Sequence, residues 1–185
     1  MLESIRRSIG LGAARFHFRS SHDPVISFGH SIATSDRVLV VMPLRASAEE
    51  GQTHVLTFLR EHFYEPDITV IAAPGGTPVE RVLPRCRVLL VGPEDVNGFF
   101  LPRRSFLARL AERSYDLAID LNLDFMIPSA YICRETNARV RTGFSALHAD
   151  TFFNFQVRLE SGSHGAPAYD RLVRCLQMFF SAEGV

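Results

Sequence analysis

The sequence predicts an α/β fold, in which two layers of helices cover a mostly parallel β-sheet. Short runs of aliphatic and β-branched residues alternate along the chain with segments of helical periodicity. The runs are apolar throughout, which is typical of strands buried on both faces. A helix or a long connection separates successive runs, as parallel pairing requires. Together these observations favour a three-layer α/β/α sandwich.

The most informative stretch is Tyr115–Phe144, which has the pattern of a strand, a crossover helix and a second strand. We expect these strands at Leu117–Leu121 and Ala138–Thr142. Two polar residues, Asn122 and Asp124, directly follow the first strand. The carboxyl ends of parallel strands form the edge where open α/β sheets bind ligands. The sequence therefore indicates a ligand site just after residue 121.

The remaining elements follow from the same patterns. Gly143 is expected to close the strand before it. The other buried runs are Arg37–Met42, Ile68–Ala72 and Arg87–Val91, and Thr151–Leu159 reads as a last strand or an extended loop. Helices are expected from an N-cap at Ser47 to a break at Pro66, across Ser105–Arg113, and from Tyr169 to Phe180.

The first 35 residues are the least regular part of the chain, and we expect residues 1–35 to be an extension that packs on a single domain of residues 36–185. A short helix is predicted to begin near Glu3 and to end at Gly10 and Gly12. The alternating stretch Arg15–Arg19 favours a short, half-exposed strand.

Composition excludes several classes of function. The formal net charge is zero, so no overall field favours nucleic acid. All 20 basic residues are arginine, which excludes a Walker-type phosphate lysine and a Schiff-base lysine. No segment is apolar for long enough to span a membrane, and we expect a cytoplasmic protein.

No bound cofactor or metal is predicted. The G-x-G-x-x-G fingerprint is absent, and the loop Pro74–Pro78 reads as a turn in preference to a phosphate cradle. The three cysteines are widely separated, and His17, His22 and His30 lack the spacing of metal ligands. The basic face of the helix at 105–113 is read as solvated, with a patch for an anionic acceptor as the alternative.

Four stretches resemble the N-terminal half of glycosyltransferase family 9, the ADP-heptose:lipopolysaccharide heptosyltransferases. They are RVLVV from Arg37, FLREHFYEPDITVIAAP from Phe58, YDLAIDLN followed by RVRTGF, and APAYDRLVRCLQMF from Ala166. Their order and spacing carry the likeness, which covers about residues 36–180. The resemblance implies the GT-B fold, in which two Rossmann-like domains face each other across a cleft. It also implies that this chain corresponds to the acceptor-side domain.

The chain departs from the family at the position of the general base. The family places a Gly-Asp pair shortly after the first strand, and its aspartate is taken to deprotonate the acceptor hydroxyl. Here the same offset falls on Ser47 and Ala48, and alanine cannot accept a proton. Glu49 is adjacent, but one residue turns a side chain by about 100° on a helix. The resemblance also implies that the nucleotide-sugar domain would begin where these 185 residues end.

The sequence thus predicts a glycosyltransferase-like, acceptor-side domain that is inactive alone or depends on a partner in cell-envelope sugar assembly. The predicted substrate-binding residues are Arg45, Ser47, Asn122 and Asp124, with Glu49 as a weak candidate base. Expected partners are a glycosyltransferase chain or a second copy, and an anionic sugar acceptor. The alternatives are a non-enzymatic interaction module, with Phe99, Phe100 or Phe179–Phe180 as its contact surface, and a flavodoxin-like small-molecule-binding protein.

Overall fold

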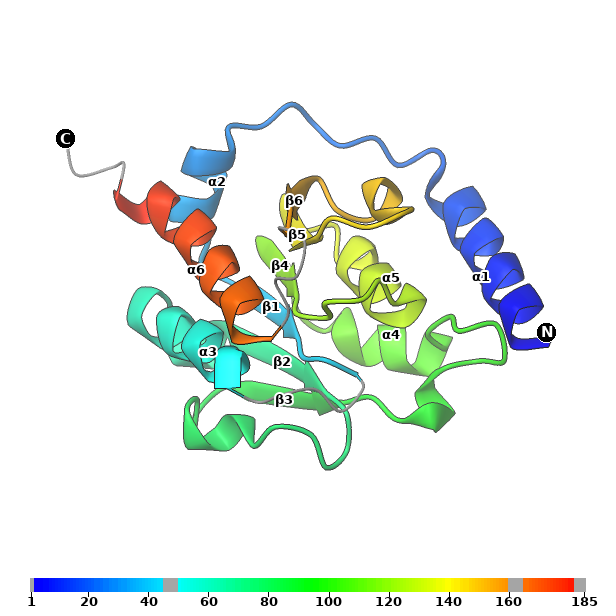
Figure 1. Ribbon diagram of the computed structural model, residues 1–185, viewed down its shortest axis with the longest axis horizontal. Helices are drawn as coiled ribbons and strands as arrows, with labels where there is room; N and C mark the ends of the chain where they lie inside the picture. Colours follow the sequence, from blue (N-terminus) through cyan, green and yellow to red (C-terminus); the bar gives the residue numbers. More distant parts are fainter. Residues whose placement is uncertain (1, 45–49, 160–164, 182–185) are drawn as a thin grey trace.

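The computed structural model describes residues 2–44, 50–159 and 165–181, and it contains one parallel β-sheet of six strands. The strands are β1 (Val38–Val41), β2 (Ile68–Ala72), β3 (Arg87–Leu90), β4 (Leu117–Asp120), β5 (Val140–Phe144) and β6 (Phe155–Val157). Their order in the sheet is β3-β2-β1-β4-β5-β6 (Figure 1), and each neighbouring pair is parallel. The predicted parallel sheet is confirmed.

The described residues form six α-helices around this sheet. They are α1 (Leu2–Phe18), α2 (Phe28–Ala33), α3 (Glu50–His62), α4 (Arg104–Leu110), α5 (Ile127–Glu135) and α6 (Ala166–Ser181). Short 3-10 turns lie at Glu65–Asp67, Val79–Arg81, Pro93–Asp95 and Ala149–Thr151. The strand order reverses between β1 and β4, because the chain leaves β1 toward β2 and later returns to the other side of β1. Loops that follow these two strands diverge, which opens a crevice in folds of this kind.

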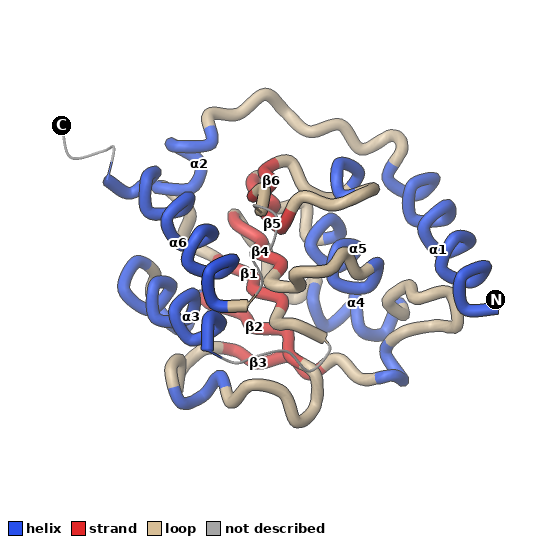
Figure 2. Tube along the Cα trace, in the orientation of Figure 1, coloured by secondary structure: helices blue, strands red, loops and turns tan. Residues whose placement is uncertain are grey.

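The helices form two layers, as predicted, and each layer has its own hydrophobic core (Figure 2). Successive side chains of a strand point to opposite faces of the sheet. Val38 and Val40 of β1 therefore belong to the core shared with α2, α3 and α6, whereas Leu39 and Val41 belong to the core shared with α4 and α5, and α1 packs on α5 (Figure 1). Burial on both faces explains why the strand sequences are uninterrupted apolar runs.

The N-terminal segment differs from the prediction. Helix α1 runs through Gly10 and Gly12 and includes the stretch that was expected to be a strand. A Cβ atom on Gly10 would lie 1.8 Å from the carbonyl oxygen of Phe99, so this glycine permits a close approach and does not end the helix. The alternation near residue 17 arises because Phe18 is buried while Phe16 is 63% exposed.

Strand β5 also differs from the prediction, because it begins two residues later and contains Gly143. A Cβ atom at that position would lie 2.9 Å from the ring of Phe153. The glycine therefore makes room for an aromatic ring inside the strand instead of closing it. The stretch at 151–159 forms the short strand β6, so of the two readings the strand is correct.

The remaining helix predictions agree with the structure over the described residues. Helix α6 buries Tyr169, Leu172 and Leu176 against the face of the sheet that α3 also covers. Gly51 lies where α3 meets α6, and a Cβ atom there would lie 2.3 Å from the ring of Tyr169. The proposed N-cap, Ser47, lies outside the described residues. The division into an extension and a domain at residue 35 stays a prediction.

Candidate functional site

A cavity of about 730 Å³ lies at the carboxyl edge of the sheet, beside the point where the strand order reverses. Its walls come from α1, from the loops after β1, β4 and β5, and from the first turns of α5 and α6. Its polar lining residues are Glu3, Arg7, Asn122, Asp124 and His148. This is the region where the sequence predicted a ligand site, and a cavity of this size suits a small ligand.

Asn122 holds the loops after β1 and β4 together. Its side-chain oxygen accepts a hydrogen bond from the backbone N–H of Leu44 at 2.9 Å. Its amide nitrogen donates to the carboxylate of Asp120 at 2.6 Å and to the backbone carbonyl of Met42 at 3.4 Å. The residue is 7% exposed. Although Asn122 lines the cavity, its polar atoms are engaged within the protein, so its role here is to fix the shape of the cavity.

Asp120 anchors this network from below. Its side chain is 3% exposed and also accepts a hydrogen bond from the backbone N–H of Asn122 at 3.0 Å. Burial raises the pKa of Asp120 to about 6, and hydrogen bonds from Asn122 and Ser129 oppose that rise. Ser129 lies in the first turn of α5. The carboxylate thus links the loop after β4 to the helix that follows it.

Asp124, an exposed carboxylate at the cavity, lies two residues beyond the buried network. Arg7 lies on the facing helix α1, and its guanidinium donates a hydrogen bond to the carbonyl of Phe125 at 2.6 Å. Glu3 is one turn before Arg7 on the same helix. Two carboxylates and one guanidinium therefore line the cavity, a set that can donate to and accept from several hydroxyl groups.

His148 and several apolar residues complete the lining. His148 has a φ of 75°, a left-handed conformation that is uncommon for residues other than glycine and occurs often at functional sites. Leu11, Pro43 and Phe125 provide apolar wall. Glu3, Arg7 and His148 were not predicted from the sequence. No local pattern marks them, because Glu3 and Arg7 are one turn apart on α1 but far in the chain from His148 and the loop after β4, and only the fold brings these parts together.

Most of the predicted site residues fall outside the described part of the chain. Arg45, Ser47, Ala48 and Glu49 lie in the gap between β1 and α3. The residues on either side of that gap are Leu44, which bonds to Asn122, and the start of α3. The roles assigned to these four residues therefore stay predictions.

The described residues give little support to a metal site or to a cysteine nucleophile. Among residues 2–44, 50–159 and 165–181, no group of three or more histidine, cysteine, aspartate or glutamate side chains lies close enough together to hold a metal ion. His17 instead pairs with Glu135, with 3.3 Å between the ring nitrogen and the carboxylate. The cysteines are free thiols, and burial, with the charges of Glu65 and Glu80, raises the pKa of Cys86 to about 11. A thiol with so high a pKa is a poor nucleophile at neutral pH.

The surfaces that were predicted for partner binding are partly occupied. Phe180 packs against Phe58 and Phe63, and Phe179 packs against Phe155, so both rings belong to the edge of the core. Phe99 is 44% exposed, and Phe100 lines the cavity. The basic face of α4 is partly paired, because Arg109 forms an ion pair with Asp95 at 2.9 Å. No helix within the described ranges is both long and apolar enough to cross a membrane.

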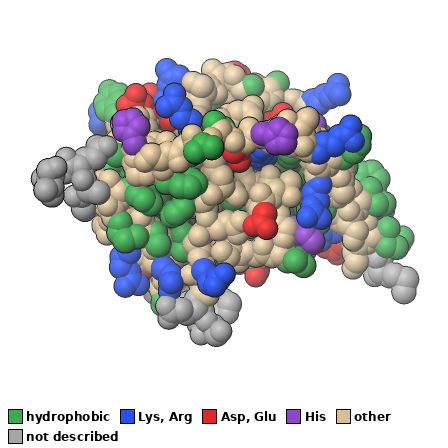
Figure 3. All heavy atoms as spheres, turned by 90° about the horizontal axis from the view of Figure 1, so that it is seen from above, with side chains coloured by type: hydrophobic (Ala, Val, Ile, Leu, Met, Phe, Trp, Pro, Cys, Tyr) green, Lys and Arg blue, Asp and Glu red, His purple; other side chains and the backbone are tan. Residues whose placement is uncertain are grey.

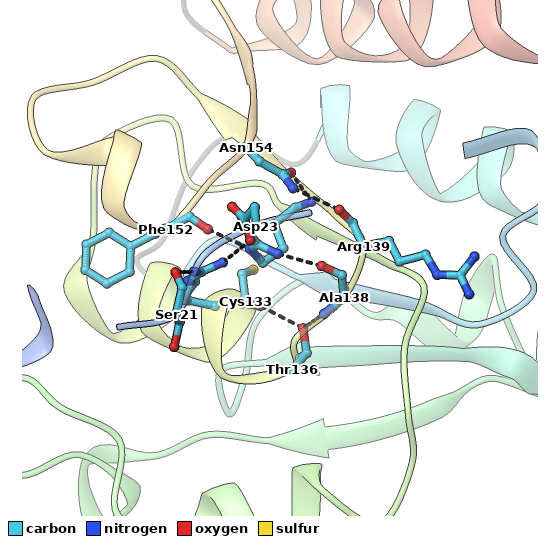
Figure 4. A network of polar contacts seen from close by, with 10 residues as sticks. Ser21, Asp23, Cys133, Thr136, Ala138, Arg139, Phe152 and Asn154 are labelled. Atoms are coloured by element: carbon cyan, nitrogen blue, oxygen red, sulfur yellow. Dashed lines mark hydrogen bonds and ion pairs between the residues drawn. The ribbon is translucent and has the colours of Figure 1, made fainter. Parts of the chain in front are cut away.

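A second buried polar network lies on the same face of the sheet as α5 (Figure 4). Arg134 and Arg141 both bond to the carboxylate of Asp23, at 2.6 and 2.5 Å. Arg141 also donates to the carbonyls of Phe152 and Ala138, at 3.0 and 2.6 Å. The two arginine side chains are 6% and 3% exposed. This network fastens the segment between α1 and α2 to the domain, which positions α1 beside the cavity.

Comparison with known proteins shows a likeness to a solved structure. No protein-family model matches the chain, and no curated protein sequence matches it. The fold is similar to that in a crystal structure described as the glycosyl transferase family 9 from Veillonella parvula DSM 2008, with a TM-score of 0.51 and 17% sequence identity. The match covers 78% of this chain and 41% of that one. At this identity the likeness shows the fold alone, and it confirms the predicted Rossmann-like α/β/α sandwich.

Proposed function

We propose that this chain is the acceptor-side half of a two-lobed, glycosyltransferase-like system of the heptosyltransferase kind. In this proposal the cavity at the carboxyl edge binds a hydroxyl-rich acceptor of cell-envelope sugar assembly. A second lobe, from a partner chain or from polypeptide outside these 185 residues, holds the nucleotide-sugar. The chain by itself has no sugar-transfer activity.

The observation that carries the proposal is the composition of the cavity. Carboxylates at Glu3 and Asp124 accept hydrogen bonds from hydroxyl groups, and the guanidinium of Arg7 donates to hydroxyl or carboxylate oxygens. The ring of Phe125 and the side chain of Leu11 offer apolar wall to the carbon faces of a sugar. The cavity lies where the strand order reverses, the general position of ligand sites in open α/β sheets.

The likeness to the family 9 structure supports the two-lobe part of the proposal. The matched 78% of this chain covers 41% of that chain, which leaves room there for a second lobe beyond the matched part. The base position of the resembled family falls on Ala48, which cannot accept a proton. Asp124 and Glu3 are the carboxylates that line the described cavity, and we assign Asp124 to acceptor binding.

Calorimetric titration of the purified chain tests the proposal. The probes are glucuronate as an anionic sugar, glucose as a neutral one, and ADP-glucose as a nucleotide-sugar. We expect the two monosaccharides to bind and Asp124→Ala to weaken the binding of the neutral glucose roughly tenfold or more, because a hydrogen bond to a charged group contributes about 1.5–3 kcal/mol. Glu61→Ala, which removes an exposed carboxylate on α3, is the matched control.

Three outcomes would contradict the proposal. Equal sugar binding by the Asp124→Ala and Glu61→Ala variants would place the acceptor elsewhere. Sugar transfer by the purified chain alone would show that the activity does not depend on a second lobe. A flavin or nucleotide retained through purification would favour the flavodoxin-like alternative.

A further inference from the structure

Helix α1 packs on the domain through one narrow face. Gly10, Ala14 and Phe18 are its buried residues, and they recur every four positions. Gly10 lies directly against the carbonyl of Phe99, and Phe18 packs on Tyr131 with 4.8 Å between ring centroids. Glu3, Arg7 and Leu11, which line the cavity, lie on an adjoining row with the same spacing. The inward side of α1 therefore either packs on the domain or lines the cavity.

The outward side of α1 is also apolar. Leu2, Ile5, Ile9 and Phe16 are 72%, 50%, 51% and 63% exposed. Ile9 and Phe18 are nine residues apart, about two and a half turns of helix, so their side chains point in opposite directions. The exposed stripe from Leu2 to Phe16 is about 21 Å long. Figure 3 shows hydrophobic side chains along the edge of the molecule on the α1 side.

Such a stripe is unusual for a surface helix, whose outward side is normally polar. These four residues are among the ten large hydrophobic side chains that are exposed in the described chain, and Phe99 lies next to α1. Apolar residues that are clustered in this way, rather than scattered singly, indicate an interaction surface.

The charge distribution identifies the kind of surface that α1 meets. Residues 2–19 contain four arginines and one glutamate, a net charge of +3, whereas the remainder of the neutral chain carries −3. Arg6 lies on α1 beside the stripe, and the guanidinium of Arg19 lies 3.8 Å from the centre of the exposed Phe16 ring. Arginines that flank an apolar stripe are the pattern of helices that lie in the headgroup region of anionic membranes.

A second copy of this chain fits the stripe less well. A symmetric dimer would place the same patch of both copies in contact and so bring together two helices of charge +3. In an asymmetric contact, the stripe of one copy would bind the acidic surface of a second copy. The stripe of that second copy would stay exposed, so further copies could add without end. An anionic bilayer avoids both difficulties, because it covers the apolar stripe and neutralises the arginines at once.

We propose that the outward face of α1 docks this protein on an anionic membrane surface, with Leu2, Ile5, Ile9 and Phe16 in the headgroup region. Docking leaves the inward row of Glu3, Arg7 and Leu11 facing the cavity. The helix precedes the part of the chain that resembles glycosyltransferase family 9, and the proposal stands independently of what the cavity binds.

Co-sedimentation of the whole 185-residue chain with vesicles tests this proposal. One vesicle preparation contains equal parts of phosphatidylglycerol and phosphatidylcholine, and the other contains phosphatidylcholine alone. We expect binding to the anionic vesicles to be at least about tenfold stronger and to weaken as salt is added. Ile9→Glu should reduce binding to the anionic vesicles by about tenfold or more, because it places a carboxylate in the stripe.

Met178→Glu is the matched control, since it makes the same kind of change at a side chain of α6 that is 61% exposed. It should leave vesicle binding and thermal stability unchanged. Equal binding of the wild-type chain to both vesicles, or unchanged binding of Ile9→Glu, would overturn the proposal. A dimer in analytical ultracentrifugation that Ile9→Glu dissociates would also overturn it and would assign the stripe to a second copy.

Discussion

Two aspartates of this protein, the buried Asp120 and the partly exposed Asp23, have pKa values shifted in opposite directions. Asp120 lies beneath the cavity with neutral donors, Asn122 and Ser129, and burial raises its pKa to about 6. Asp23 lies between Arg134 and Arg141; burial alone would raise its pKa, but hydrogen bonds from both arginines and their charges hold the pKa below its usual value. The difference shows that the charge of the partners decides the direction of the shift.

The two networks also connect different parts of the chain. The Asp120 network joins the loops after β1 and β4, so it shapes the cavity from within the domain. The Asp23 network joins the segment between α1 and α2 to α5 and β5, so it fixes the position of α1. One network therefore supports the candidate site directly, and the other supports it through the helix that forms its outer wall.

The largest effect is expected from Asp23→Ala. It leaves two almost fully buried arginines without their shared carboxylate and close to each other. Removing one partner from a buried ion pair typically costs 3–5 kcal/mol, and we expect about 3 kcal/mol here because Asp23 is partly exposed. Urea unfolding measures this loss, with His22→Ala as the neighbouring control. A loss below about 1 kcal/mol would mean that the network contributes no more than a surface ion pair.

The pH dependence of stability separates the two aspartates. The pKa of Asp120 is higher in the folded state, so the folded protein binds more protons between about pH 4 and 6. Its contribution therefore falls as pH rises through that range, by an amount on the order of 2–3 kcal/mol. The pKa of Asp23 is lowered in the folded state, so its contribution is present above about pH 4 and is lost as pH falls further.

Urea unfolding at a series of pH values checks both signs. Asp120→Asn should remove the decline between pH 4 and 6, and Asp23→Asn should remove the loss on the acid side. If Asp120→Asn left the stability profile between pH 4 and 6 unchanged, burial would not raise the pKa of Asp120.

The smallest effect of the series is expected from Asn122→Ala. It leaves the N–H of Leu44 without a partner and removes one of the donors to the carboxylate of Asp120, and we expect a loss of about 2 kcal/mol in unfolding free energy. A residue that serves only to contact a ligand would leave stability unchanged. Comparison of urea midpoints for Asn122→Ala and Asp124→Ala therefore distinguishes the structural asparagine from the exposed aspartate, for which we expect no loss.

The sequence predicted the location of the site better than its composition. Asn122 and Asp124 were identified because they follow a strand, and both line the cavity. The sequence could not show that Asn122 bonds inward, because its partners Leu44 and Met42 lie about 80 positions away. Arg7 reaches the cavity through a contact with Phe125, 118 positions away, and nothing in the local sequence marks that contact.

By itself, the sequence determined the layers, the parallel sheet and the amphipathic helix α6, because burial of a strand or helix face leaves a periodic pattern within the element itself. Only the tertiary structure decided what the glycines do. Gly10 lies within a helix and Gly143 within a strand, and glycine is needed there because Phe99 and Phe153, outside these elements, approach them closely. The same reason applies to the two aspartates: a pKa depends on neighbouring charges and burial, and both are set by the fold rather than by adjacent residues.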